Sequence, residues 1–247
     1  MNKIYQVLLL LAAAITLFLV LKETTPVTFK SDNALEPQII VSTELKNISQ
    51  ADIDAVKKEV GKALKFIPPI LGIDYEKAIE IKIVDKGGIC NAVGGIVSLF
   101  VSHIRDRSAP IIHEVTHVIT LHEDNNFFSE GLAVYFQERF GESQVFPNFS
   151  VPFNDLIKRN KDQLIPITRL INDNEIFEQV DTEQRKLAYL TAGSFISFLV
   201  EKYGEQKLAD LNNSRALNYK KIYGRDINQL EAEWENHVFE EPPSRSI

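Results

Sequence analysis

Cysteine is almost absent from this chain, since Cys90 is the only one among 247 residues. A single cysteine excludes an intramolecular disulfide and a zinc site made of several thiolates. We therefore expect Cys90 to be a small core residue. Clusters of lysine or arginine are also missing, and the net charge is −7. Because nucleic-acid binding depends on clustered cations that neutralise phosphates, we expect no nucleic-acid partner.

Internal repeats and low-complexity segments are missing as well, which excludes a repeat architecture. The hydrophobic content of 45% and the charged content of 25% are ordinary for a globular protein. The length of 247 residues allows one sizeable domain or two small ones.

An apolar run at the N-terminus predicts a membrane-spanning segment. It extends from Ile4 to Leu21, and only Gln6 and Thr16 within it are polar. As a helix it would be about 27 Å long, close to the roughly 30 Å hydrocarbon core of a bilayer. No small-residue cleavage motif follows the run, so we favour an uncleaved signal-anchor over residues 1–22 to a cleaved signal peptide. Either alternative places the rest of the chain outside the cytoplasm, anchored or secreted.

Composition and periodicity divide the remaining chain into a linker, one domain and a tail. Residues 23–37 have the polar, proline-containing composition of a linker, and residues 241–247 form a frayed tail. In the domain, residues 38–240, predicted strands precede predicted helices, which indicates an α+β fold with a small mixed or antiparallel sheet. The predicted strands are 38–45, 78–84 and 96–104, and the predicted helices are 50–66, 111–122, 129–140, 154–160, 168–171, 182–203, 205–211 and 227–239.

Two details of this pattern concern single residues. Pro68 and Pro69 are expected to end the first helix, since proline lacks the N–H that a helix interior needs. His103 is expected on a face of the third strand rather than at a ligand position.

The segment His113-Glu114-Val115-Thr116-His117 has the H-E-x-x-H pattern. Two histidines four residues apart project from one face of a helix. Both imidazoles can then reach one metal ion at the roughly 2.0–2.1 Å of a zinc–nitrogen bond. The neighbouring Glu114 can act as general base on a zinc-bound water. The alternative is a pair of ordinary histidines on a solvated helix face.

Apolar side chains on the opposite arc of this helix favour the metal interpretation. The arc contains Ile111, Ile112, Val115, Val118 and Ile119. A helix with this pattern buries its apolar arc in the core and turns the histidines toward a cleft.

Catalytic zinc has three protein ligands and one open position, so a third ligand is needed. We predict Glu130, with Ser129 as the N-cap that places it in the first turn of the next helix. Gly131 would leave room where two helices approach closely. The alternative is that Glu130 only complements the helix dipole, and Asp124 is a second carboxylate candidate.

Other candidates near the motif fail on geometry or pattern. His122 lies on a different side of the same helix, so it cannot reach the same ion. The metzincin pattern requires glycine and histidine where this chain has Thr120 and Glu123. Residues that can orient the imidazoles are Asn126, Asp124 and Thr116, and the sequence does not choose among them.

Four motifs together resemble one family. They are His113-Glu114-x-x-His117, Ser129-Glu130-Gly131-x-Ala133-x-Tyr135, Tyr189-x-x-Ala192-Gly193-Ser194-Phe195, and a C-terminal segment from Tyr223 to Trp234. Over about residues 38–240 the chain resembles gluzincins, the zinc metallopeptidases of the thermolysin-like clan, and within them the peptidase MA-like family. The resemblance implies a zincin-like fold, in which a small sheet is followed by the active-site helix and a mostly helical C-terminal half.

The resemblance also implies a mechanism and a substrate. Zinc bound by His113, His117 and Glu130 activates water, and Glu114 is the general base. Similar enzymes supply a further donor to the developing oxyanion, for which Tyr189 is the candidate; the alternative is that Tyr189 is a core residue. A peptide or protein substrate would dock on a sheet edge, for which residues 96–104 are the expected strand.

Two competing functions remain open at this stage. One is a zinc hydrolase that acts on non-peptide amides or esters with the same metal site. The other is a membrane-tethered binding or scaffolding module with a retired site, although the complete motif and Glu130 argue against it.

Overall fold

The computed structural model describes residues 38–85, 88–120, 125–141, 145–179, 182–214 and 216–240, together with the backbone of residues 27–29. The predicted anchor, residues 1–22, and the predicted tail, residues 241–247, lie outside the described residues. Within the described part, no helix is both long enough and apolar enough to cross a bilayer.

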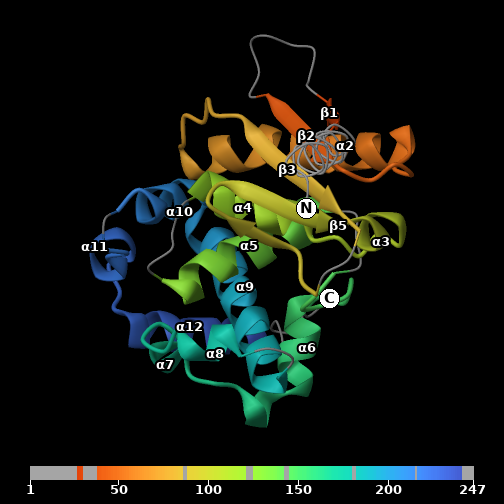
Figure 1. The fold of residues 1–247 in the computed structure, drawn as a ribbon. Coiled ribbons are helices and arrows are strands. Elements are labelled where there is room, and N and C mark those ends of the chain that lie inside the picture. The colour runs from red at the N-terminus through yellow and green to blue at the C-terminus, as the bar shows by residue number, and fades with distance from the viewer. Residues whose placement is uncertain are drawn as a thin grey trace, which may run out of the picture.

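Five strands of the described chain form one mixed sheet in the order β1-β2-β3-β5-β4 (Figure 1). The strands are β1 (Val27–Phe29), β2 (Ile39–Thr43), β3 (Ile79–Val84), β4 (Asn91–Val93) and β5 (Ile96–Phe100). The central strands β2, β3 and β5 are parallel, whereas β1 and β4 pair antiparallel at the two edges. Because the rest of the chain is mostly helical, the predicted α+β, zincin-like class is confirmed.

The first strand, β1, lies within residues 23–37, for which the sequence predicts a linker. It pairs with β2 in the register Val27 to Thr43. The sheet therefore extends into the predicted linker, because an edge strand needs only three paired residues and leaves no periodic pattern to detect.

The third predicted strand is too long by four residues. β5 ends at Phe100, and the short helix α3 (Val101–Arg105) begins directly after it. Continued strand alternation from Val97 would point His103 into the sheet core. The helix instead buries Val101 and Ile104, one turn apart, and leaves His103 half-buried outside the sheet.

The first helix, α2 (Gln50–Leu71), begins at Ser49, whose hydroxyl accepts from the N–H of Asp52 while the Asp52 carboxylate accepts from the N–H of Ser49. It contains Pro68 and Pro69 in its last turn, so the predicted end at residue 66 is wrong. The helix ends at Gly72 (φ 62°), whose N–H bonds back to the carbonyl oxygens of both prolines. The left-handed Gly72 ends the helix, and the prolines remain within α2 although each lacks the N–H that a helix interior uses.

Three longer helices form the centre of the molecule: α4 (Ile111–Thr120), α5 (Asn126–Phe140) and α9 (Glu183–Tyr203). Figure 1 shows α4 and α5 between the sheet and the lower helices, with α9 crossing below them. α4 contacts α2 and the strands β4 and β5, and α5 packs against both α4 and α9. In α9 every residue from Leu187 to Ile196 is buried, so this helix is the core of the C-terminal half.

The remaining helices of the C-terminal half surround α9. They are α6 (Phe153–Arg159), the 3-10 helix η1 (Lys161–Gln163), α7 (Ile167–Leu170), α8 (Glu175–Glu178), α10 (Glu205–Asn212), α11 (Tyr219–Tyr223) and α12 (Ile227–Phe239). The predictions for α6, α7, α10 and α12 are confirmed to within one or two residues. η1, α8 and α11 were not predicted; they are too short for a 3.6-residue period to distinguish them reliably from loops.

A buried polar chain holds α6, α9 and α12 together. The Ser194 hydroxyl accepts from Nε1 of Trp234 at 2.9 Å and donates to Oδ1 of Asn154 at 2.8 Å. Each of these polar atoms is satisfied in an apolar environment, where an unpaired group would be costly. The chain therefore fixes the position of α9 relative to its neighbours.

Gly131 is a point of close approach between α5 and α9. A Cβ added there would lie 2.9 Å from the Ala192 carbonyl oxygen and 3.0 Å from Cγ1 of Ile196. The sequence predicted close helix packing at Gly131, and the neighbour is α9.

Gly131→Ala should destabilise the fold. Overpacking against a backbone carbonyl costs about 1–3 kcal/mol, and the higher helix propensity of alanine offsets roughly 0.5–1 kcal/mol of that. Gly61→Ala is the matched control, since a Cβ at Gly61 in α2 meets nothing within 4 Å. Chemical denaturation should show a lower free energy of unfolding for Gly131→Ala and a higher one for Gly61→Ala. Equal shifts for both would contradict the packing argument.

Candidate metal centre

The H-E-x-x-H segment lies on α4, as predicted, with both histidines on one face of the helix. The apolar arc is buried, including Ile112 and Val115, which have 0% exposure. The rings of His113 and His117 lie 4.9 Å apart between centroids, and their Nε2 atoms are 3.2 Å apart. The helix therefore aims two imidazole nitrogens at one point.

Glu130 lies on α5 and reaches the same point. Its Oε2 atom is 3.1 Å from Nε2 of His113 and 3.4 Å from Nε2 of His117. The predicted cap is wrong, since α5 is capped by Asn125, whose side chain accepts from the N–H of Phe128 at 2.9 Å. Glu130 therefore lies in the second turn, beyond the reach of a purely terminal helix-dipole role.

These three atoms form a nearly regular triangle with edges of 3.1, 3.2 and 3.4 Å. Tetrahedral ligands with bonds of 2.0–2.1 Å lie roughly 3.3–3.4 Å apart. Among the described residues, His113, His117 and Glu130 are the group of histidine, cysteine and acidic side chains whose ligand atoms converge in this way. The triangle thus has the size and the donor set of one face of a zinc site.

The electrostatics of the triangle also fit a cation. Oε2 of Glu130 is buried and has no donor with hydrogen-bond geometry. Burial raises the pKa of Glu130, but the two adjacent imidazoles outweigh burial and hold that pKa below its usual value. Burial lowers the pKa of His113. Metal binding requires an ionised carboxylate and neutral imidazoles, which Glu130 and His113 match. At His117 the charge of Glu130 outweighs burial and raises the pKa.

Glu114 is buried, with 6% exposure, although it points to the same side as the cluster. Burial raises its pKa to about 8, with a further increase from the negative charge of Glu130, while His117 and Arg185 oppose the shift. A carboxyl group with a pKa near neutrality can both accept and donate a proton at physiological pH.

Tyr189 and Arg185 lie on α9, on the other side of the cluster. The Tyr189 ring stacks parallel to that of His113 with centroids 6.2 Å apart. Its hydroxyl accepts from Nη2 of Arg185 at 3.1 Å, and the side chain is buried. Tyr189 is thus a packed residue that also lines the pocket, and its catalytic role stays a prediction. Arg185 was not predicted, because a charged residue in the first turn of a helix gives no local signal of a site.

The cluster opens into a pocket of about 390 Å³. Its wall is formed by the triangle and Glu114, by Phe146, Arg185 and Tyr189, and by the strand segment Ile89 to Ala92. The volume lies within the roughly 300–1,000 Å³ typical of ligand sites. The sheet edge at this pocket is β4, which pairs only with β5 among the described strands, so the predicted edge strand, residues 96–104, is wrong.

A comparison with family models identifies the domain. The model of the peptidase MA superfamily matches residues 89–240. The chain belongs to this superfamily. No curated protein matches the chain. The matched range begins at the pocket residue Ile89 and includes the whole cluster, so the resemblance seen in the sequence is confirmed.

Ser129 is placed to orient one imidazole of this peptidase MA domain, since its Oγ lies 3.0 Å from Nδ1 of His117. Gln137 instead accepts from the backbone N–H of His113 at 3.0 Å, so it holds α4 and not the imidazole ring. Neither residue was predicted. Thr116 instead donates to the Ile112 carbonyl of its own helix, and Asn126 contacts Asn174. The third candidate, Asp124, lies outside the described residues.

Ser129→Ala should weaken zinc binding by about 10- to 100-fold, which is the usual cost of removing a partner of a metal-bound histidine. The side chain is 7% exposed and its hydroxyl bonds Nδ1 of His117, so its loss frees that imidazole to rotate. Competition with a chelator of known affinity measures the change. The matched control is Ser197→Ala, since the Ser197 hydroxyl bonds Glu201 on the exposed side of α9. Unchanged affinity in Ser129→Ala would show that Ser129 does not orient His117.

Cys90 is buried as predicted, but it also lines the pocket of the peptidase MA domain. Its Sγ lies 3.5 Å from Nδ1 of His103, and burial raises its pKa to about 11. The thiol is therefore protonated at neutral pH and is not a zinc ligand or a nucleophile in this state.

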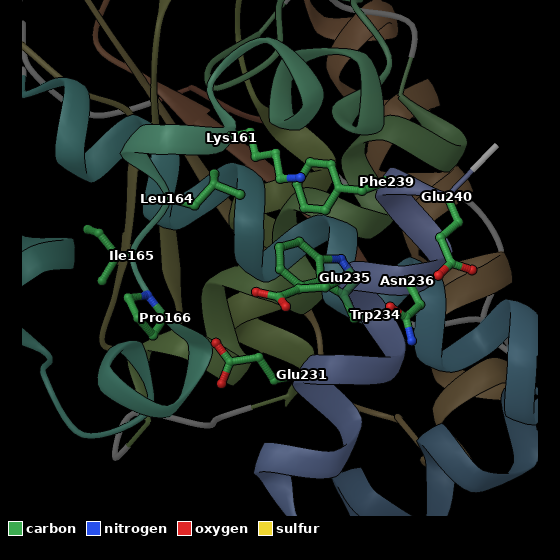
Figure 2. Close-up of a pocket in the computed structure, with 10 residues that line it drawn as sticks. All are labelled: Lys161, Leu164, Ile165, Pro166, Glu231, Trp234, Glu235, Asn236, Phe239 and Glu240. Atoms are coloured by element: carbon green, nitrogen blue, oxygen red, sulfur yellow. The ribbon is translucent and has the colours of Figure 1, made fainter.

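A second pocket of the peptidase MA domain, about 430 Å³ in volume, lies between α12 and the η1–α7 segment (Figure 2). Its Glu231 carboxylate accepts from the N–H groups of Ile167 and Thr168. Lys161 lies over the Phe239 ring at 4.7 Å, as Figure 2 shows. These side chains are occupied in packing α7 and η1 on α12, and the pocket contains no converging ligand set.

Proposed function

We propose that this protein is a zinc-dependent metallopeptidase of the gluzincin type. The observation that carries the proposal is the triangle of Nε2, Nε2 and Oε2 atoms from His113, His117 and Glu130, with edges of 3.1–3.4 Å. Two imidazoles and a carboxylate are a known ligand set of catalytic zinc. Membership of the peptidase MA superfamily supports the same conclusion.

Glu114 is the proposed general base. It neighbours His113 on α4 and lines the same pocket, yet it is not a corner of the triangle. Zinc bound there would lower the pKa of water and polarise the scissile carbonyl. Glu114 would accept the proton of the attacking water and deliver it to the leaving amine. A carboxyl group is suited to this task when burial raises its pKa, as it does at Glu114.

Tyr189 is proposed to donate to the oxyanion that develops at the scissile carbonyl. Its hydroxyl accepts a hydrogen bond from Arg185, so the phenolic proton points away from Arg185, on the side where the negative charge of Glu130 acts on the hydroxyl. Burial raises the pKa of Tyr189 far above its usual value, so the hydroxyl keeps this proton at neutral pH. A fixed, protonated donor in a dry site is the arrangement that stabilises developing charge.

The substrate is proposed to be a peptide or protein segment that docks in extended form along β4. This strand leaves one edge without a partner among the described residues, and its residues Asn91 and Ala92 line the pocket. Main-chain hydrogen bonds to such an edge hold a peptide regardless of its sequence.

We further propose that residues 1–22 act as a signal-anchor and that residues 38–240 form the peptidase domain outside the cytoplasm. The support is the apolar run from Ile4 to Leu21, whose length matches a bilayer. Cys90 has no partner cysteine in the chain, so folding in that compartment does not depend on disulfide formation.

Metal content and peptide cleavage test the proposal together. Purified protein should contain about one zinc per chain by elemental analysis and should cleave members of a peptide library. Removal of zinc with a chelator should abolish cleavage, and added zinc should restore it. Cleavage of simple amides or esters but of no peptide would favour the non-peptide hydrolase. Bound zinc with no cleavage of any substrate would favour the retired-site module.

A further inference from the structure

Arg185 carries a positive charge on the wall of the pocket beside the cluster. Its Nε donates to the carbonyl oxygen of Phe177 at 3.0 Å and its Nη2 to the hydroxyl of Tyr189 at 3.1 Å. Arginines elsewhere in the described chain, such as Arg105 and Arg139, form ion pairs with carboxylates. No carboxylate of the described residues forms an ion pair with Arg185, although its charge acts on the nearby Glu114.

The guanidinium group of Arg185 is held between two aromatic rings. Its Cζ lies 5.5 Å from the centroid of Phe146 and 4.9 Å from that of Tyr189. Aromatic faces and two hydrogen bonds fix the plane of the group, so little conformational entropy is left to lose on binding. Of its five N–H donors, two bond to described groups, and the other three have no hydrogen-bond partner among the described residues.

We propose that Arg185 is a specificity-determining residue that binds a carboxylate of the substrate, an inference that rests on the proposed peptidase function. A planar guanidinium with parallel free N–H groups matches a carboxylate in a bidentate arrangement. A residue that served only to position Tyr189 would need a single donor and no charge on the pocket wall. The bound group is either the C-terminal carboxylate of a peptide or the side chain of Asp or Glu near the scissile bond.

Two series of N-acetylated tripeptides distinguish these sources. The first compares the free acid with the C-terminal amide for peptides with neutral side chains. The second compares Glu with Gln as the last residue of C-terminal amides. Binding is measured by calorimetry on full-length, zinc-loaded protein carrying Glu114→Gln to prevent turnover, and kcat/KM is measured on the protein with Glu114 intact.

We expect the carboxylate member of one series to bind about 10- to 100-fold more tightly than its neutral partner, as hydrogen bonds to a charged group allow. Arg185→Met should reduce this ratio to below about 3-fold. Arg185→Lys, which keeps the charge but loses the planar fork, should reduce it partly and serves if Arg185→Met fails to fold. Arg169→Met is the matched control, because the exposed Arg169 pairs with Asp173 outside the pocket, and it should leave the ratio unchanged.

Three results would overturn the inference. Equal binding of both members, or no binding of either, would remove the carboxylate preference. A preference that persists in both Arg185 variants would mean that the carboxylate binds zinc directly. An equal loss for charged and neutral peptides would mean that Arg185 only positions Tyr189. Arg185-dependent binding without any cleavage by the intact protein would uphold the carboxylate site and refute the peptidase, whereas cleavage without preference would do the reverse.

Discussion

Glu114→Gln should lower kcat/KM for peptide cleavage by at least about 10²-fold, and up to about 10⁴-fold, because general acid–base groups contribute this much. Glutamine keeps the size of the side chain but cannot accept the proton of the attacking water. The zinc content should stay at about one per chain, since the converging atoms belong to His113, His117 and Glu130. Elemental analysis and steady-state kinetics on the same preparation check both halves of this expectation.

Glu138→Gln is the matched control for this substitution. Glu138 is an exposed carboxylate on α5 that lines a different pocket, so its amide variant should retain both zinc and activity. Normal cleavage by Glu114→Gln would show that the proton is accepted elsewhere. Loss of zinc in Glu114→Gln would mean that the buried carboxyl supports the metal site rather than the chemistry.

Glu130→Gln should lower zinc affinity by more than about 100-fold, because it removes a direct ligand, whereas loss of an indirect partner already costs 10- to 100-fold. An amide oxygen carries no net charge to offset that of the ion, and the Oε2 position lies only 3.1 Å from Nε2 of His113. Peptide cleavage should be lost together with the metal. These two variants distinguish the roles of the two glutamates, because Glu114→Gln should keep zinc and lose activity, whereas Glu130→Gln should lose both.

Thermal unfolding with and without zinc gives an independent measurement. A ligand at 100 times its Kd stabilises the native state by about 2.7 kcal/mol. Zinc should therefore raise the Tm of the unmodified protein and of Glu114→Gln by several degrees, but not that of Glu130→Gln. A full zinc-induced shift in Glu130→Gln would remove this carboxylate from the ligand set.

The local parts of the site were predictable from residue spacing. A helix repeats every 3.6 residues, so His113 and His117 had to share a face of α4 once the apolar arc was recognised. The strand β3 follows for the same reason, since Ile79, Ile81 and Ile83 alternate with exposed residues and are buried in the sheet. In both cases the information lies within one turn or one pleat of the chain.

The ends of α5 and α2 were not predictable from residue spacing. Ser129 is a residue type that often caps helices, but the N-cap of α5 is Asn125. The Ser129 hydroxyl contacts His117 instead. Pro68 and Pro69 resemble a helix end, but Gly72 provides it. Several residues in each stretch have the chemistry of a cap, and the packing of α5 and α2 on their neighbours selects one of them.

The sequence by itself identified the candidate metal ligands, because H-E-x-x-H is a pattern within one helix and Glu130 follows it in a short motif. Their convergence to edges of 3.1–3.4 Å depends on α5 packing against α4. The stacking of Tyr189 on His113, the charge of Arg185 in the pocket and the exposed edge of β4 depend on α9 and the sheet order. Such contacts join residues dozens of positions apart, and periodicity within a single element contains no information about them.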